Sequence, residues 1–408
     1  MDFMNNTNKS LKLLCTAMLF LIIGCADNNE KPATKLKDAP LEPFQIELLD
    51  IAFESVSAMP VYPHIKNRSR AQEEVVQTCL ELGQPKRALG YIERIENWYQ
   101  QFAYAELAFY CAQNEFSNND VEHFLDKAKQ IPDDIQDWQK DRIKVKIAET
   151  YAYLGDKEKA NEYEKGVEPS ENGKVARINA MSCTKETFNK QINILDALIA
   201  TEEFDIVKNA LIAYVELYKN IYKDIERREL IEKKITTSWD SLPISVRIEL
   251  LIELADCCLS YDNKTEAIRF VNQAKSLIDS ATWQPKYLIP IKARIAKIQY
   301  LSGKKEAAIS EIQKSLNIYE KNLPKIVNIY KAGVLRPIAE ATIVFGDRDL
   351  TLDIYQKAME AGFENPNSRP RAEDLSAACC SMAINNFDPE AGLLARIKEI
   401  QNSLGDPW

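Results

Sequence analysis

The residue with the clearest chemical role is Cys25, because its position gives a thiol a specific task. It follows Gly24 directly, after an uncharged run of eleven residues, Leu13–Ile23, that is preceded by Lys9 and Lys12. The run is too short to cross a bilayer, which takes about 20 apolar residues. A cationic start, a short apolar run and a small residue at the cut are typical of a secretory signal peptide. A thiol at this place supplies a nucleophile that can accept a lipid.

The residues Ile22-Ile23-Gly24-Cys25 resemble the lipobox of bacterial lipoproteins. In that family the cysteine is alkylated by a diacylglyceryl group, the chain is cut before it, and the new amino group is acylated. The resemblance implies a signal peptide over residues 1–24 and a lipid anchor on Cys25. Several acyl chains hold firmly, since each buried CH₂ contributes about 0.8 kcal/mol. The alternative is a buried cysteine that ends a hydrophobic core helix.

The expected lipid anchor predicts the cellular location of the protein. Residues 25–43 contain Pro32, Pro40 and Pro43 among charged side chains, so we interpret them as a lipidated polar linker. The folded part would then lie in the periplasm or outside the cell, held at the cell membrane or outer membrane.

The rest of the sequence offers little catalytic or metal chemistry. It has no nucleophile elbow, no zinc-protease helix, no phosphate loop and no Gly-rich dinucleotide turn. The carboxylate pairs Glu73-Glu74 and Asp133-Asp134 are expected on solvated surfaces, and the only histidines are His64 and His123. We therefore expect no enzyme activity, no cofactor and no metal.

Cysteines are numerous for an exported protein. Apart from Cys25 and Cys15, which lies in the predicted signal peptide, none is spaced for a zinc or redox motif, and we interpret the other seven as small buried hydrophobic residues. They are Cys79, Cys111, Cys183, Cys257, Cys258, Cys379 and Cys380.

The charge of the chain excludes one class of partner. The formal net charge is −9, whereas nucleic-acid binding normally requires a basic face. Adhesion to anionic lipid is disfavoured for the same reason, so membrane contact should depend on the lipid on Cys25.

A repeated pattern of small residues around glycine predicts the fold. The clearest copy is Ala148-x2-Tyr151-x3-Gly155-x4-Ala160, in which Gly155 should end one helix in a left-handed cap and Asp156 should begin the next. Other copies centre on Gly83, Gly303, Gly346, Asp262 and Asn386.

Such units form helix–turn–helix hairpins. Most turn signals recur at intervals of about 36 to 43 residues, a spacing typical of an α-solenoid. The gaps before and after Phe204 are wider, and the second is expected to hold an extra helix over 225–236. They lie at Gly83, Asn119, Gly155, Phe204, Asn263, Gly303, Gly346 and Phe387.

The pattern resembles the tetratricopeptide repeat (TPR) family. The resemblance covers about Arg70 to Ser403 and implies an all-α, α-α superhelix of about seven to eight hairpins. We expect a short N-terminal helical or cap segment over 44–69 and the TPR-like solenoid over 70–408. Trp408 is a candidate to cover the last hydrophobic face, since a terminal repeat lacks a neighbour.

The resemblance also implies a binding groove lined by the first helix of each hairpin, with a protein or peptide as the partner. The candidate groove residues, whose alternative is ordinary exposed helix surface, are Arg142, Glu149, Tyr153, Glu253, Tyr261, Lys297, Tyr300, Arg336 and Glu340. An aromatic cluster, interpreted mainly as core and otherwise as a contact surface, contains Trp98, Tyr99, Phe102, Tyr104, Phe109 and Tyr110.

Together these observations predict a membrane-anchored lipoprotein that serves as a helical scaffold for protein–protein interaction or assembly. The alternative is a ligand- or glycan-binding component of a nutrient-uptake system, which would need long loops carrying aromatic and polar groups.

Overall fold

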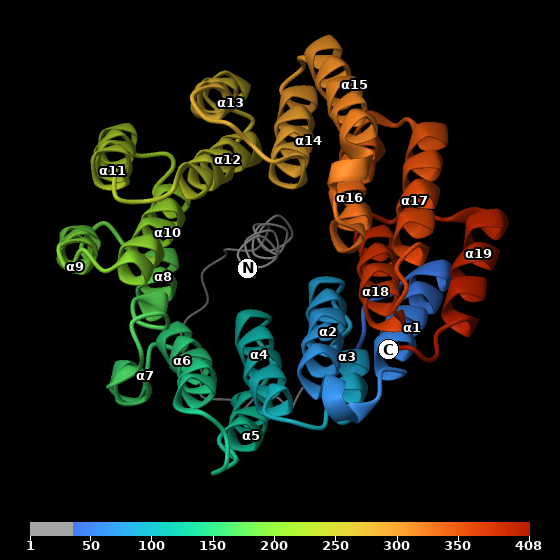
Figure 1. Ribbon diagram of the computed structural model, residues 1–408. Helices are drawn as coiled ribbons and strands as arrows, with labels where there is room; N and C mark the ends of the chain where they lie inside the picture. The colour runs from blue at the N-terminus through green and yellow to red at the C-terminus, as the bar shows by residue number, and fades with distance from the viewer. Residues whose placement is uncertain (1–35) are drawn as a thin grey trace. The chain divides into compact units, whose positions relative to one another are not determined.

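The protein is all-α, as its repeat pattern predicts (Figure 1). The computed structural model describes residues 36–408, and over these residues the helices pack in neighbouring pairs, consistent with an α-α superhelical repeat. No strand occurs in this range. The predicted signal peptide, Cys25 and most of the linker lie outside the described residues.

The described chain divides into two compact units. Unit 1 contains Trp98–Cys257, and unit 2 combines Lys37–Asn97 with Cys258–Trp408. The second unit is therefore assembled from both ends of the described chain.

Unit 1 has two layers of helices. The inner layer in Figure 1 contains α4, α6, α8, α10 and α12, and the outer layer contains α5, α7, α9 and α11. The helices are α4 (Tyr99–Gln113), α5 (Asn118–Ala128), α6 (Asp137–Tyr153), α7 (Lys157–Glu164), α8 (Lys174–Met181), α9 (Phe188–Ile199), α10 (Phe204–Asn220), α11 (Ile225–Ser238) and α12 (Ile244–Ser260), whose last turn belongs to unit 2. The extra helix expected over 225–236 is α11.

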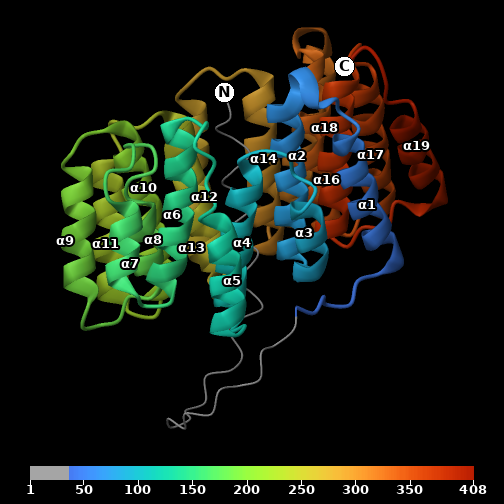
Figure 2. The same ribbon diagram turned by 90° about the horizontal axis from the view of Figure 1, so that it is seen from below.

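Unit 2 contains helices from the two ends of the chain. They are α1 (Pro43–Ser57), α2 (Val61–Glu81), α3 (Pro85–Ile92), α13 (Lys264–Asp279), α14 (Pro285–Leu301), α15 (Lys305–Asn322), the 3₁₀ turn η1 (Leu323–Lys325), α16 (Asn328–Phe345), α17 (Arg348–Phe363), α18 (Ser368–Ile384) and α19 (Glu390–Asn402). In Figure 2, α1, α2, α16, α17, α18 and α19 lie side by side with their axes roughly aligned.

The predicted helix ends adopt the expected left-handed backbone. All six central residues of the repeat have positive φ, from 50° at Asn386 to 84° at Gly303. Asp156 caps α7, since its carboxylate accepts from the Lys159 amide at 3.1 Å. Two other turns lie a few residues before the positions predicted, with φ of 55° at Glu115 and 59° at Glu202. Asn119 lies instead in the first turn of α5, because Ser117 caps that helix.

The first helix of the described chain packs along the last long one. Within unit 2, α1 lies on α18, and both helices bury apolar side chains completely or nearly so. The Gln45 side-chain amide donates to the Ala383 carbonyl at 2.8 Å, in a buried bond across the seam. The terminal face therefore has a neighbour, supplied by the start of the chain. Trp408 packs at the edge of this seam, against Val56, Met59, Ala71 and Ala372.

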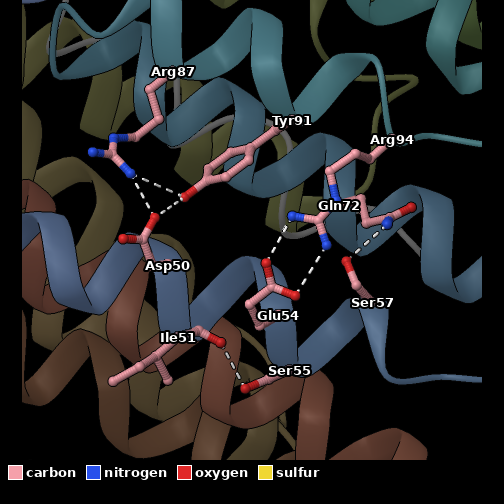
Figure 3. A network of polar contacts seen from close by, with 9 residues as sticks. All are labelled: Asp50, Ile51, Glu54, Ser55, Ser57, Gln72, Arg87, Tyr91 and Arg94. Atoms are coloured by element: carbon pink, nitrogen blue, oxygen red, sulfur yellow. Dashed lines mark hydrogen bonds and ion pairs between the residues drawn. The ribbon is translucent and has the colours of Figure 1, made fainter.

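Ion pairs also fix α1 to α3 (Figure 3). Asp50 accepts from Arg87 at 2.5 Å and from the Tyr91 hydroxyl at 2.6 Å. Arg94 donates two hydrogen bonds, of 2.7 and 3.0 Å, to the Glu54 carboxylate. The Phe53 and Tyr91 rings stack between these pairs, with centroids 4.0 Å apart.

The end of the predicted linker is attached to the same unit. Asp38 accepts from the Lys86 amide at 2.8 Å and so caps the start of α3, whose own N-cap side chain, Gln84, makes no such bond. Ala39 donates to the Gly83 carbonyl at 2.8 Å. The chain is thus fixed from Asp38 onward.

The cysteines behave as small hydrophobic residues. All seven in the described residues are free thiols and all are buried, which confirms the prediction made from their spacing.

Candidate binding surface

The most distinctive surface of unit 1 lies where α4 and α6 pack side by side. Aromatic rings from α4 and its N-cap alternate there with cationic and aromatic side chains from α6. We call this set the α4–α6 ladder; it contains Trp98, Phe102, Phe109, Trp138, Arg142, Lys146 and Tyr153.

Helical spacing brings these residues onto one line. On α6, Trp138, Arg142 and Lys146 follow one another at intervals of four, so their side chains share one face of the helix. On α4, Phe102 lies four residues after the N-cap residue Trp98, so these two side chains also share one face of their helix. The alternating buried positions of α6, such as Ile143 and Ile147, fix the other face in the core.

The contacts run along the whole seam. The Trp98 and Trp138 rings meet edge to face at 5.5 Å, and Arg142 lies 4.4 Å above the centre of the Phe102 ring. One turn further, Lys146 lies 4.6 Å from the centre of Phe109. Cations over aromatic faces are attracted by the ring quadrupole, by about 0.5–1 kcal/mol at exposed sites and more when desolvated.

Part of the ladder remains open to solvent. Trp138 is 40% exposed and Tyr153 37%, while Trp98 and Phe102 are buried. Burial and the charge of Glu115 raise the pKa of Tyr153 above its usual value, so its hydroxyl keeps its proton at neutral pH. Exposed aromatic side chains beside cations are the residue types that dominate binding hot spots.

The three predicted groove residues of α6 therefore lie close together, but they differ in availability. Tyr153 is exposed and Arg142 is partly exposed, whereas Glu149 is 8% exposed and pairs with Lys146 at 3.1 Å. Glu149 thus orients a neighbouring cation and presents little surface of its own.

Several of the remaining predicted residues are used in packing. Glu253 is buried in unit 1, and Tyr261 lies just beyond the end of α12 in unit 2. The Tyr300 ring stacks on Phe345 at 4.4 Å and its hydroxyl donates to the Phe345 carbonyl at 2.9 Å. This joins α14 to α16, and Lys297 lies half-buried on the same helix.

The α16 pair has a similar structural role. Glu340 accepts from the Ser381 hydroxyl at 2.7 Å, and Ser381 also bonds to the Tyr355 hydroxyl at 2.8 Å. Arg336 lies 3.9 Å from the Glu340 carboxylate. The network links α16, α17 and α18 and leaves Glu340 engaged.

Sequence reasoning missed Trp138 and Lys146. The signal was present, because both lie on the α6 face that carries Arg142, four residues to either side. Of the aromatic cluster, Trp98, Tyr99, Phe102 and Tyr104 are buried, as predicted for core residues, while Phe109 and Tyr110 are half-buried.

Comparisons with known proteins add no family. The sequence matches no protein-family model, and a search of curated proteins finds no match.

None of the helices in 36–408 is both long enough and apolar enough to pass through a membrane. No group of three or more His, Cys, Asp or Glu side chains in that range is arranged to hold a metal ion.

Proposed function

We propose that this protein is a lipid-anchored scaffold outside the cytoplasm that holds a protein partner on the inner layer of unit 1. The observation that carries the proposal is the α4–α6 ladder, which joins exposed aromatic side chains to cations on adjacent helices. The helical-hairpin architecture supports it, since stacked hairpins present extended surfaces that bind other chains.

The anchor on Cys25 is a separate part of the proposal. Its support is the lipobox-like sequence and the attachment of Asp38 to α3, which leaves only a short chain between the lipid and the folded unit. Twelve residues lie between Cys25 and Asp38, which makes thirteen steps along the chain, and each step spans at most about 3.6 Å. Asp38, where the chain joins the folded unit, would therefore stay within about 47 Å of the lipidated cysteine.

Membrane fractionation tests the anchor. The wild-type protein should sediment with membranes and be released by detergent, whereas Cys25→Ala should be soluble or retain its signal peptide. Equal membrane retention of a correctly cut Cys25→Ala protein would refute the anchor.

Purification from a detergent extract tests the scaffold. We expect Trp138→Ala and Tyr153→Ala to lose a partner that the wild-type protein retains, because each removes an exposed ring from the ladder. Ile225→Ala is the control, since Ile225 is 60% exposed on α11 in the outer layer. A partner that ignores both ladder substitutions, or that is lost equally from the control, would count against this surface.

A further inference from the structure

Arg142 lies over aromatic rings, as other arginines of this chain do, but in the described residues it has no carboxylate partner. Its guanidinium carbon is 4.4 Å from the centre of the Phe102 ring and 5.8 Å from those of Trp98 and Tyr99. Among residues 36–408, no carboxylate oxygen lies within 4.0 Å of its nitrogens and no hydrogen-bond acceptor is in place. A guanidinium carries five N–H donors and stays charged at any physiological pH.

Two other arginines that lie over aromatic rings also have a carboxylate partner. Arg94 lies 4.7 Å from the centre of Phe53 and also forms two bonds to Glu54, as Figure 3 shows for the ion pair. Arg396 lies 4.7 Å from the centre of Phe363 and forms bonds of 2.8 and 2.7 Å to Glu360. In both, an aromatic ring supports the guanidinium and a carboxylate receives its paired N–H groups.

The carboxylates near Arg142 in sequence are already occupied. Asp141 accepts from Lys144 at 3.2 Å and from the Glu168 amide at 3.1 Å. Glu149 pairs with Lys146 at 3.1 Å. Both carboxylates already have partners, and neither lies within 4.0 Å of the Arg142 side-chain nitrogens.

We propose that Arg142 receives a carboxylate from the partner, with Trp138 packing on the residue that carries it. This rests on the proposed function, because it assigns a ligand chemistry to the same ladder. The Phe102 ring lies against the guanidinium, and two parallel bonds from a guanidinium to a carboxylate are the geometry that favours arginine over lysine. The charge also agrees, since Arg142 is a cation without an anion in an otherwise acidic protein.

The occupant is an acidic side chain, Asp or Glu, within a polypeptide. The exposed rings of Trp138 and Tyr153 offer apolar contact on either side along α6, which suits the residues that flank an acidic position in a peptide. A terminal carboxylate and an acidic sugar share the anion, so the test distinguishes them.

The test uses pools of short acetylated and amidated peptides on the immobilised full-length protein. One pool has a fixed central Glu among mixed uncharged residues, a second has Gln, and a third has Gln with a free terminal carboxylate. We expect the wild type to retain the Glu pool about tenfold better than the Gln pool, because a carboxylate can form a charge-assisted bidentate contact with Arg142 that an amide cannot. Preference for the third pool, or displacement of bound Glu peptides by oligogalacturonate at lower concentration than by free Glu peptide, would overturn the choice of occupant.

Three variants assign the effect to Arg142. In Arg142→Gln the ratio of Glu-pool to Gln-pool retention should fall close to one. Arg142→Lys keeps the charge but lacks the planar guanidinium that makes two parallel bonds, so its ratio should fall to about a third of the wild-type ratio. Lys157→Gln is the matched control, because it removes one positive charge from an exposed position on α7 in the same unit. Far-UV circular dichroism checks folding; were Arg142→Gln to unfold, Arg142→Lys would decide.

The outcomes separate this inference from the proposed function. Equal retention of the Glu and Gln pools by the wild type, or an unchanged ratio in a folded Arg142→Gln, would overturn the carboxylate site. If Trp138→Ala still released the co-purified partner in that case, the scaffold would stand and only the ligand chemistry would fall.

Discussion

The buried hydrogen bond from Gln45 to Ala383 provides a quantitative test of how the start of the chain is fixed. Gln45 is 6% exposed, its oxygen accepts from the Glu42 amide at 3.0 Å to cap α1, and its nitrogen donates to Ala383 across the seam with α18. Replacing Gln45 by Ala removes both bonds. A cap contributes about 1 kcal/mol and a buried hydrogen bond about another 1. We therefore expect Gln45→Ala to lower the free energy of unfolding by about 2 kcal/mol.

Gln139 supplies a matched control in unit 1. It occupies the same position in the capping box of α6, is 8% exposed and accepts from the Gln136 amide at 2.8 Å, but no long-range bond from its side chain is present in residues 36–408. Gln139→Ala should therefore cost only the cap, about 1 kcal/mol. The difference between the two substitutions isolates the bond across the seam.

A carboxylate at position 45 sharpens the result. Gln45→Glu keeps an acceptor for the Glu42 amide but, when ionised, places a negative oxygen beside the Ala383 carbonyl and cannot donate to it. It should destabilise more than Gln45→Ala at pH 8 and less near pH 4, where a protonated carboxyl can donate. Urea unfolding followed by circular dichroism measures all three. Equal losses for Gln45→Ala and Gln139→Ala, or a pH-independent effect of Gln45→Glu, would refute the reasoning.

Three further predictions concern stability and packing. Enclosure of the Asp374 carboxyl raises its pKa to about 8 from an ordinary 3.8, against the opposing charge of Arg336, so the native state should lose stability as pH rises from about 4 to 8. Asp374 keeps some exposed surface, which reduces the size of the expected effect. In urea unfolding, the free energy of unfolding of Asp374→Asn relative to the wild type should rise by roughly 2 kcal/mol between pH 4 and pH 9. Parallel pH profiles for the two proteins would contradict this. Gly155→Ala should cost about 1 kcal/mol because φ is +82°, whereas Gly90→Ala, in a helix with open space around the added carbon, should stabilise by about 0.5; a loss at both or neither would be inconsistent with the left-handed cap. The seven buried thiols should react with Ellman's reagent only after denaturation, and rapid reaction in native buffer would show that their burial is wrong.

The helical hairpins could be predicted because their determinants are local. A glycine, aspartate or asparagine that adopts a left-handed conformation, followed by a polar cap, marks a helix end whatever the chain does elsewhere. Gly155 and Asp156 illustrate this, since both behave as the local pattern requires. Asn119 and Phe204 were less informative, because a glutamate occupies the left-handed position in each of those turns.

The assembly of unit 2 could not be predicted in the same way. The contact between Gln45 and Ala383 joins residues 338 positions apart, and no periodicity in one segment identifies a partner so distant. An amphipathic helix at 43–57 shows only that it needs to bury one face. Which neighbour covers that face depends on how the intervening helices place the two ends.

The candidate surface was predicted in part. Helical position identified Arg142 and Tyr153, but it could not show that Tyr300 and Glu340 are engaged with Phe345 and Ser381. Whether a side chain is available to bind a partner depends on its contacts with side chains of neighbouring helices. Only those contacts distinguish an arginine that has a carboxylate partner from one that has none.

Site-specific photo-crosslinking in cells tests the central claim most directly. A photoreactive phenylalanine analogue at Tyr153, at the exposed end of the ladder, is compared with the same analogue at Glu162, which is exposed on α7 in the outer layer. A scaffold that holds its partner on the inner layer of unit 1 should give a discrete crosslinked product from position 153 and none from 162. Crosslinks of equal yield from both positions, or from 162 alone, would contradict the account.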